Sequence, residues 1–247
     1  MLPRGRTQEA LGGWILAAAL AAATPAAASS FTIAPIRVEL GPGHTRGVLT
    51  LRNEGDAPVT VQVETVAWSQ PQGTDQYTAT TDLITTPPVF VVAAKSRQIV
   101  RVALRRDADA ARELPYRLFF QEVPQTDDAA VNGLRVALRL GVPVFVAPLK
   151  SKAAPALTWK ASLTSAGELQ IEARNQGTAH VQVTGFELTS GSQSQPVRIA
   201  GARYVLPDSA VSWKATRPPG FDPSQPLHIH GQSDQGEISA DIARIGP

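Results

Sequence analysis

The sequence lacks cysteine altogether, and this absence excludes several classes of protein at once. A chain without thiols has no disulfide scaffold, no thiolate zinc site, no iron–sulfur cluster and no cysteine nucleophile. Its four histidines are then the main candidates for metal binding or acid–base chemistry. With 247 residues the chain can still bury one or two ordinary cores without covalent cross-links.

An excess of charge of either sign is also lacking. The 23 Lys and Arg residues against 21 Asp and Glu residues give a formal net charge of +2, and neither sign gathers in a long run. Nucleic-acid-binding proteins and acidic tails show runs or clusters of that kind. We therefore expect no nucleic-acid partner.

Residues that disfavour helices are plentiful by contrast, with 20 prolines and 19 glycines. Proline breaks helix interiors and glycine weakens them, so a helical bundle is disfavoured. The composition favours an all-β protein with many turns.

Residues 1–28 are typical of a cleaved secretory signal peptide. Arg4 and Arg6 give a positive start, an apolar stretch follows, and small alanines precede Ser29. A membrane anchor is the alternative, but it needs about 20 apolar residues, and Pro25 interrupts this run. We expect a mature chain without stable membrane insertion, located in the periplasm or secreted.

The mature chain predicts short strands separated by turns at a spacing of about 8 to 12 residues, which is typical of a β-sandwich. The strands expected in the first part of the chain are residues 31–40, 47–53, 59–68, 86–92, 97–104, 114–124 and 134–146. Weaker alternation follows at residues 169–175 and 180–188.

A small, basic, proline-containing stretch at residues 149–156 has the composition of a linker. It divides the mature chain into an expected domain at residues 29–148 and a second at residues 157–247. Asn53-Glu54-Gly55 and Asn175-Gln176-Gly177 each follow a strand, which is a weak internal echo between the two parts.

The segment with the strongest pattern is residues 134–140. Every even position from Leu134 to Leu140 holds a large aliphatic side chain, whereas the odd positions between them are small or cationic. This alternation fits an ordinary strand that buries one face in its own core. It also fits a strand lent to a partner, where main-chain hydrogen bonds give affinity and the aliphatic side chains fill the partner's groove.

Three segments together resemble the periplasmic pilus-assembly chaperones of the PapD type. Thr86-Pro87-Pro88-Val89 with the basic strand 95–102 resembles the family's proline-proline turn and the strand after it. Residues 116–124 resemble its aromatic strand, which ends in Glu, an aliphatic residue and Pro, and residues 134–140 resemble its donor strand. The three occur in the family's order and at about its spacing.

The resemblance implies two immunoglobulin-like sandwiches joined as a boomerang, with no reaction and no cofactor. The chaperone would bind a pilus (fimbrial) subunit that lacks its last strand and release it at an outer-membrane usher. The residues implied to enter the subunit are Leu134, Val136, Leu138 and Leu140. The sequence leaves open whether the free chaperone self-associates.

In conventional members of this family, an arginine of the first strand and a lysine of the donor strand bind the subunit's C-terminal carboxylate. The arginine matches Arg37, but the lysine position holds Pro143, and this departure is similar to the archaic, or alternative, class. Arg101, set between two valines, is the preferred replacement cation, and Arg139 is the other. Exposed strand arginines with no binding role are the alternative for Arg37 and Arg101.

Other functions find less support in the sequence. It contains no Gly-x-Ser-x-Gly, no His-Glu-x-x-His and no phosphate-binding loop, so we expect no enzyme. His228 and His230 alternate on one strand, but two ligands are too few for a tight metal site. A secreted adhesin or carbohydrate-binding module stays the alternative, although the tryptophans are dispersed rather than gathered in a platform.

Overall fold

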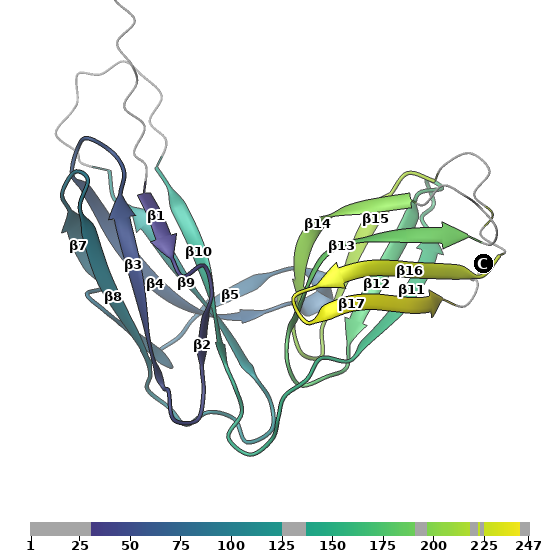
Figure 1. Ribbon diagram of the computed structural model, residues 1–247, viewed down its shortest axis with the longest axis horizontal. Coiled ribbons are helices and arrows are strands. Elements are labelled where there is room, and N and C mark those ends of the chain that lie inside the picture. The colour runs from purple at the N-terminus through teal and green to yellow at the C-terminus, as the bar shows by residue number, and fades with distance from the viewer. Residues whose placement is uncertain (1–30, 125–136, 191–196, 218–221, 223–224, 243–247) are drawn as a thin grey trace, which may run out of the picture.

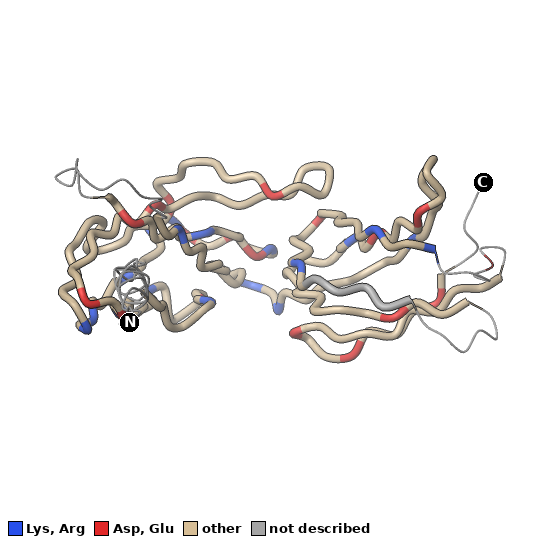
Figure 2. Tube along the Cα trace, turned by 90° about the horizontal axis from the view of Figure 1, so that it is seen from above, with Lys and Arg blue, Asp and Glu red and all other residues tan. Residues whose placement is uncertain are grey.

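The computed structural model describes residues 31–124, 137–190, 197–217, 222 and 225–242. These residues form two immunoglobulin-like β-sandwiches that meet at an angle, giving the boomerang outline of Figure 1. The expected all-β fold is confirmed, and positively and negatively charged residues are interspersed along the chain of both sandwiches (Figure 2).

The N-terminal sandwich consists of two sheets. The first has the order β1 (Phe31–Ala34), β3 (Arg46–Asn53), β8 (Arg97–Leu104), β6 (Leu83–Thr86). The second has the order β2 (Val38–Leu40), β10 (Arg139–Val146), β9 (Leu114–Glu122), β4 (Val59–Ser69), β5 (Gln76–Ala79), with β7 (Val89–Val92) also paired to β4. Alternation along the strands explains the core between them, because Val59, Val61 and Val63 are buried while Gln62 between them is exposed.

Several strands end at a proline. The expected strand 31–40 is two strands in different sheets, β1 antiparallel to β3 and β2 parallel to β10, separated by a segment that contains Pro35. Likewise β6 ends at Thr86 and β7 begins at Val89, on either side of Pro87 and Pro88. Proline has no N–H to donate to a ladder, so the chain leaves one sheet there and enters the other. Arg37 therefore lies in a connection between sheets rather than inside a strand.

The C-terminal sandwich pairs a sheet of order β11 (Leu157–Leu163), β12 (Leu169–Asn175), β15 (Ala210–Ala215) with one of order β14 (Val197–Val205), β13 (Val181–Ser190), β16 (Leu227–Ser233), β17 (Gly236–Ile242). Two of the dispersed tryptophans meet in this sandwich, where the rings of Trp159 and Trp213 lie 6.0 Å apart and both contact Phe186. Neither forms an exposed platform, since Trp213 is buried and Trp159 is half-buried.

The two similar turns that follow Asn53 and Asn175 have the same hydrogen-bonding arrangement. Asn53 and Asn175 are buried, and each accepts a hydrogen bond from the backbone N–H two residues later, at Gly55 and Gly177. Each side-chain amide donates to the carbonyl four residues later, at Ala57 and Ala179. Each also reaches a more distant segment, at the carbonyls of Val92 and Ala93 for Asn53 and of Val205 for Asn175. One buried amide thus holds a turn and a neighbouring strand together in each sandwich.

The two sandwiches are joined by more than the connecting chain. A short 3-10 turn η2 (Pro71–Gly73) follows β4 and reaches the C-terminal sandwich, where Arg203 donates a hydrogen bond to the carbonyl of Gly73 over 3.1 Å. The buried side chain of Gln70 accepts from the N–H of Leu206 and donates to the carbonyl of Tyr204. These contacts link the two domains directly.

Candidate functional site

One edge of β10 is open over half of its length. On one side β10 pairs with β9 along all of its residues, from Arg139 opposite Gln121 to Val146 opposite Leu114. On the other side β2 covers only Val144–Val146. In the described part of the chain, residues 139–143 have no strand on that side, and a strand edge of this kind can accept another chain.

The donor-strand prediction falls partly on this edge. Leu138 and Leu140 are half-buried and pack against the core of the N-terminal sandwich, while Arg139 between them is exposed. Leu134 and Val136 lie outside the described residues. The alternating pattern is therefore seen in space only at its C-terminal end.

A second feature is the outward face of the same sheet, which we call the junction face and define by Trp68, Tyr77, Arg117, Phe119 and Phe145. Register places these side chains on one side, because β4 pairs Trp68 with Tyr77 and β10 pairs Gly141 with Phe119. The rings form a continuous series, with neighbouring centroids 5.0 Å apart for Tyr77 and Phe119 and 6.1 Å apart for Trp68 and Phe145. Its lower end packs against Tyr204 and Leu206 of the C-terminal domain.

Arg117 is the cation among the five residues that define the junction face, and sequence reasoning missed it. Its guanidinium lies 4.3 Å from the Trp68 ring centroid, and its NH1 group donates to the Tyr77 hydroxyl over 2.7 Å. The buried Nε atom has no hydrogen-bond partner, and no carboxylate of the described residues forms an ion pair with Arg117. A half-buried guanidinium without an anion is the kind of group that recognises a carboxylate.

The unusual residues of β10 make room for Arg117. A Cβ atom on Gly141 would lie 3.3 Å from the Arg117 Cδ and 3.0 Å from the Phe119 ring. Pro143 lies directly opposite Arg117 in the ladder. Both positions are on the junction face, so the glycine and the proline leave the space that Arg117 and Phe119 occupy.

The predicted anchor Arg37 has a partner within the chain. Its NH1 group donates to Oδ2 of Asp234 over 2.6 Å, and its Nε lies 3.2 Å from Glu39. Asp234 sits in the turn between β16 and β17, so this ion pair joins the two domains. Burial alone would raise the pKa of Asp234, but His180, the N–H of Gln182 and Arg37 outweigh it and lower the pKa to about 2.

The other two predicted cations do not lie with Arg37. Arg101 is exposed on the outward face of the other sheet, opposite Val48 of β3 and Thr86 of β6. Arg139 is also exposed, pairs with Glu64 over 2.9 Å and lies 3.9 Å above the Phe119 ring. The structure therefore brings Arg139 to the junction face and leaves Arg101 on the opposite side of the sandwich.

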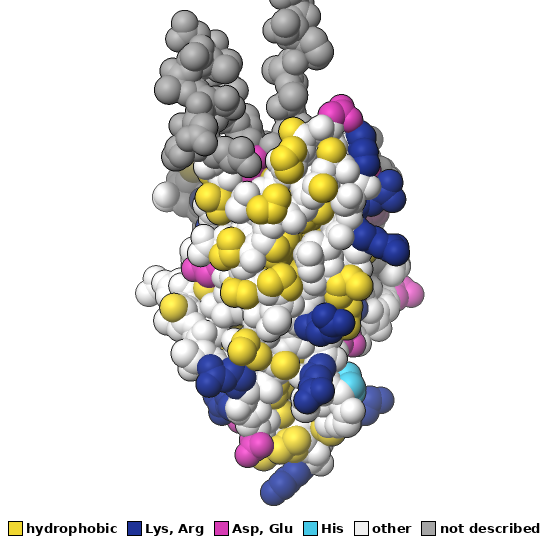
Figure 3. Space-filling model, turned by 90° about the vertical axis from the view of Figure 1, so that its left-hand side faces the viewer, with side chains coloured by type: hydrophobic (Ala, Val, Ile, Leu, Met, Phe, Trp, Pro, Cys, Tyr) yellow, Lys and Arg dark blue, Asp and Glu magenta, His cyan; other side chains and the backbone are white. Residues whose placement is uncertain are grey.

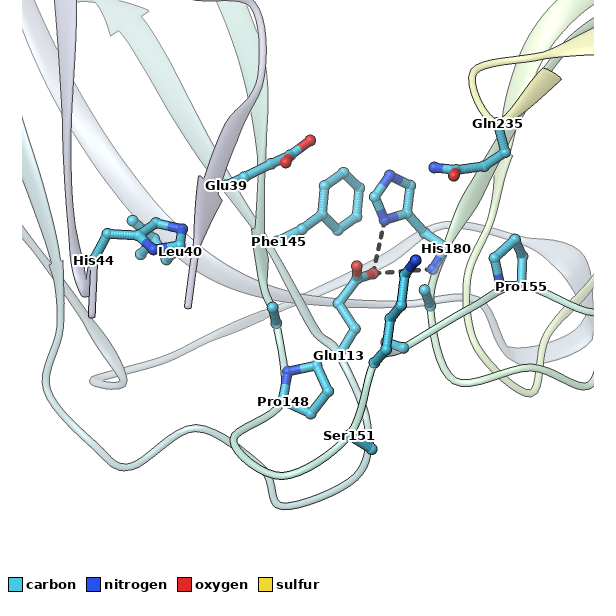
Figure 4. A pocket seen from close by; sticks show the side chains of 14 residues that line it. Glu39, Leu40, His44, Glu113, Phe145, Pro148, Ser151, Pro155, His180 and Gln235 are labelled. Carbon is cyan, nitrogen blue, oxygen red and sulfur yellow. Dashed lines mark hydrogen bonds and ion pairs between the residues drawn. The ribbon is translucent and has the colours of Figure 1, made fainter. Parts of the chain in front are cut away.

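A pocket of about 340 Å³ lies between the domains. Figure 4 shows Glu39 and Phe145 entering it from the N-terminal side and His180 and Gln235 from the C-terminal side. The imidazole of His180 stacks on the Phe145 ring, with centroids 3.4 Å apart and planes 9° apart. In the described part of the chain no group of three or more His, Asp or Glu side chains is placed to hold a metal, and none of its helices is long and apolar enough to span a membrane.

Two immunoglobulin-like sandwiches, one of them with an open strand edge, define a two-domain β-sandwich protein. Residues 30–152 match the family model described as pili and flagellar-assembly chaperone, PapD N-terminal domain. The chain belongs to this family of PapD-like pilus-assembly chaperones. It is a non-catalytic chaperone, and the resemblance seen in its sequence is confirmed.

Solved structures of related chaperones share the whole fold. The CsuC chaperone in the archaic Csu pilus pre-assembly complex with CsuE from Acinetobacter baumannii has a TM-score of 0.66 at 20% identity, covering 88% of this chain and 100% of that one. The CupB2 chaperone of Pseudomonas aeruginosa gives 0.57 at 19% identity over 87% and 100% of the two chains. The DraB chaperone of E. coli gives 0.58 at 18% identity over 87% and 97%. Among curated proteins, no sequence matches.

Proposed function

We propose that this chaperone binds pilus subunits by donor-strand complementation and delivers them to an outer-membrane usher. The observation that carries the proposal is the open edge of β10 from Arg139 to Pro143. A subunit that lacks its last strand would pair with this edge through main-chain hydrogen bonds. CsuC forms a pre-assembly complex with the subunit CsuE, and the SafB chaperone of Salmonella enterica forms a complex with the SafA pilin, which supports the same mode of action.

The even-numbered aliphatic residues Leu134, Val136, Leu138 and Leu140 are the proposed contacts in the subunit's groove. Burying four fully exposed side chains of this kind gains about 6–12 kcal/mol before the costs of ordering and association, and this is an upper limit because Leu138 and Leu140 are already half-buried. A gain of this size holds a subunit whose exposed groove would otherwise aggregate. It also allows a later exchange, in which another subunit's extension replaces the chaperone strand.

The anchor for the subunit's C-terminal carboxylate is proposed to be Arg117. Arg37 is engaged by Asp234, and Arg139 is engaged by Glu64, whereas Arg117 has no carboxylate partner among the described residues. Arg117 also lies opposite Pro143, the position that holds a lysine in conventional members. Arg37, Arg139 and Arg101 stay alternatives that the same binding experiment distinguishes.

The missing lysine favours the archaic class of these chaperones. Pro143 replaces the lysine, and the archaic Csu chaperone is among the structures that share the fold. We place the mature protein in the periplasm, after removal of residues 1–28, with domains at 29–148 and 157–247 and a linker at 149–156. A periplasmic extract whose purified chain starts at Ser29 would support this; a chain that retains residue 1 would contradict it.

The usher requires a surface distinct from the subunit site. The outward face of the first sheet carries Val48, Ile84 and Ile99, which are 54%, 47% and 42% exposed. Arg97 and Arg101 lie beside Ile99 on β8, and neither forms an ion pair within the described residues. Figure 3 shows hydrophobic side chains gathered on this end of the molecule, with Lys and Arg along one side. We assign this face to the usher. Because the face combines exposed aliphatic side chains with arginines, the usher surface that binds it should be apolar and acidic.

The donor-strand proposal is tested by co-purification of a pilus subunit with chaperone variants. Val136→Asp and Leu138→Asp should each abolish capture, because a carboxylate cannot enter an apolar groove without a partner. Val91→Asp is the matched control, since Val91 is 62% exposed on β7, away from β10. Retention of subunit by both donor-strand variants, with circular dichroism like that of the wild type, would contradict the proposal.

The usher surface needs a separate experiment. Ile99→Asp should abolish binding of the chaperone–subunit complex to the usher and leave subunit capture intact. Usher binding equal to that of the wild type would remove the assignment of this face.

A further inference from the structure

His180 joins the two domains through one buried imidazole. The residue lies just before β13 of the C-terminal domain, and its side chain is 6% exposed. Its Nδ1 is 2.7 Å from Oε1 of Glu113, which precedes β9 of the N-terminal domain, and its backbone N–H donates to the same oxygen over 3.0 Å. Its Nε2 faces Oδ2 of Asp234 at 3.6 Å, beyond hydrogen-bonding distance, and has no partner of its own.

The neutral and the protonated imidazole of His180 interact differently with the carboxylates of Glu113 and Asp234. When the ring is neutral, Nδ1 donates to Glu113 and the lone pair of Nε2 faces the negatively charged Asp234. When the ring is protonated, Nε2 carries a proton toward Asp234 and the imidazolium lies between two carboxylates. Gaining the proton therefore makes the His180–Asp234 contact within the C-terminal domain attractive instead of repulsive. It also makes the hydrogen bond to Glu113 of the N-terminal domain a charged pair, in a site from which water is largely excluded.

The ring also packs on the strand that carries the function. Phe145 belongs to β10, and its ring lies flat against the His180 imidazole. Because β10 is continuous from Arg139 to Val146, the same strand has its open edge at one end and His180 at the other. The position of the C-terminal domain is thus fixed against the N-terminal domain by two contacts of His180, with Glu113 and with Phe145. Asp234 belongs to the C-terminal domain, as His180 does, and reaches the N-terminal domain through its ion pair with Arg37.

We propose that His180 is a positioning residue whose protonated form holds the C-terminal domain against β10, which we call the clamp. Deprotonation of His180 lets the angle between the two domains vary more widely. The clamp is a property of the free chaperone. Its consequence, a weaker hold on the subunit when the clamp opens, rests on the proposed function. A chaperone that spends part of its time in an open state binds more weakly in proportion to that fraction.

The surroundings of the ring set the direction of the pH dependence. Burial lowers the pKa of His180, but Asp234 and Glu113 outweigh it and the net pKa is raised. The other charged and titratable groups around the pocket are Arg37, which pairs with Asp234, together with Glu39, His44, Lys152 and Tyr204. A raised pKa means that the stabilisation is complete below the ordinary histidine value of about 6.5 and is lost as the pH rises through the value in the folded protein.

The experiment uses the absence of cysteine from the chain. Ser96→Cys in the N-terminal domain and Ser165→Cys in the C-terminal domain, both at exposed loop positions, accept spin labels for interdomain distance measurements at pH 6 and pH 9. The wild-type background should give a narrow distance distribution at pH 6 and a broader or shifted one at pH 9. His180→Gln should give the pH 9 distribution at both pH values, because glutamine keeps a donor but cannot be protonated.

Two further variants separate the clamp from general effects of pH. His228→Gln is the matched control, because His228 also contacts a carboxylate, Asp241 at 2.8 Å, but is exposed and lies away from the junction. It should behave as the wild type does. Glu113→Gln removes one of the two carboxylates and should move the transition to lower pH, which keeps the proposal testable even if His180→Gln fails to fold.

A wild-type distribution that is identical at pH 6 and pH 9 would overturn the clamp, as would a pH response that persists in His180→Gln. The link to the subunit is measured separately with a peptide of the subunit's C-terminal strand, whose apparent Kd should rise at least about twofold between pH 6 and pH 9. An unchanged Kd would overturn that link. Absence of peptide binding at every pH would contradict the proposed function. The interdomain distances would still test the clamp, because they are measured on the free chaperone.

Discussion

Pro143 of β10 lies directly opposite Arg117 of β9, and the two positions share the junction face. The proline removes one N–H from the strand and presents no cation, while the arginine across the ladder supplies a guanidinium at nearly the same place. The positive charge that β10 lacks at Pro143 is thus present on β9 at Arg117. This relationship depends on the register of the two strands.

If Arg117 binds the subunit's terminal carboxylate, replacing it should weaken binding only when that carboxylate is present. For Arg117→Ala we expect a loss of about 1.5–3 kcal/mol in binding a C-terminal subunit peptide with a free carboxylate, the size of a charged hydrogen bond. A peptide with an amidated C-terminus should bind the wild type and the variant equally. Titration calorimetry with the four combinations measures the coupling.

Arg117→Lys is the conservative variant and should recover part of the binding, because it keeps the charge but loses the planar fork. Arg37→Ala and Arg139→Ala provide the comparison for the other cations. If one of these two, and not Arg117→Ala, removes the preference for the free carboxylate, the anchor belongs to that residue instead.

The ion pair between Arg37 and Asp234 should stabilise the junction over a wide pH range. Because the pKa of Asp234 is lowered to about 2, its contribution is complete above the ordinary Asp value of about 3.9 and is lost as the pH falls toward 2. Asp234→Asn should therefore lower Tm at pH 7 by several degrees, and the difference from the wild type should shrink between pH 4 and pH 2.

Calorimetry across this pH range checks that expectation. Glu237→Gln, at an exposed position of β17, serves as the control for removing a single carboxylate. A difference in Tm that stays constant down to pH 2 would mean that the carboxylate of Asp234 is not the source of the stabilisation.

Asn53 and Asn175 should each be essential to the stability of their own sandwich. Substitution by alanine removes a hydrogen-bond partner from three backbone carbonyls and one N–H at Asn53, and from two carbonyls and two N–H groups at Asn175. Each buried group left unsatisfied costs about 1–3 kcal/mol. Urea denaturation of Asn53→Ala and Asn175→Ala measures the loss. Gln76→Ala, at an exposed position of β5, should change stability by less than about 0.5 kcal/mol. A similarly small effect at either asparagine would refute the shared role.

Gly177 should be required for the seating of the chain that connects the domains. A Cβ atom there would lie 2.3 Å from the carbonyl oxygen of Ala154 and 2.5 Å from the nitrogen of Ala156, both backbone atoms. The connecting chain is bound at this point, because Gln176 and Thr178 donate to the carbonyls of Ala156 and Ala154 over 2.8 and 2.9 Å. Gly177→Ala should therefore free this segment and expose it to proteolysis.

Limited trypsin digestion at Lys150 and Lys152 gives the readout, with faster cleavage expected in the variant. Gly167→Asn is the control, because no atom lies near its Cβ position and asparagine tolerates its positive φ of 77°. Equal cleavage rates for Gly177→Ala and the wild type would show that the segment does not depend on this contact.

The strands with strict alternation were predictable from the sequence because side chains alternate in and out of a strand whatever it pairs with. Residues 97–104 are a single strand as expected, and 59–68 differs from β4 by one residue. The strand expected at residues 31–40 was wrong as a single element, because Pro35 divides it between two sheets. The short strands β5 and most of β6 had too little pattern to be recognised, and they form because β4 and β8 offer them a partner.

The sequence by itself determined the all-β class, the family and the alternating residues of the donor segment, since composition and local periodicity are properties of neighbouring residues. Only the tertiary structure decided which cations are engaged and which are free. Arg37 meets Asp234 across 197 positions of sequence, His180 meets Glu113 across 67, and Arg117 meets Pro143 through strand register. Such contacts depend on how sheets pair and how the two domains pack, and no local pattern records either.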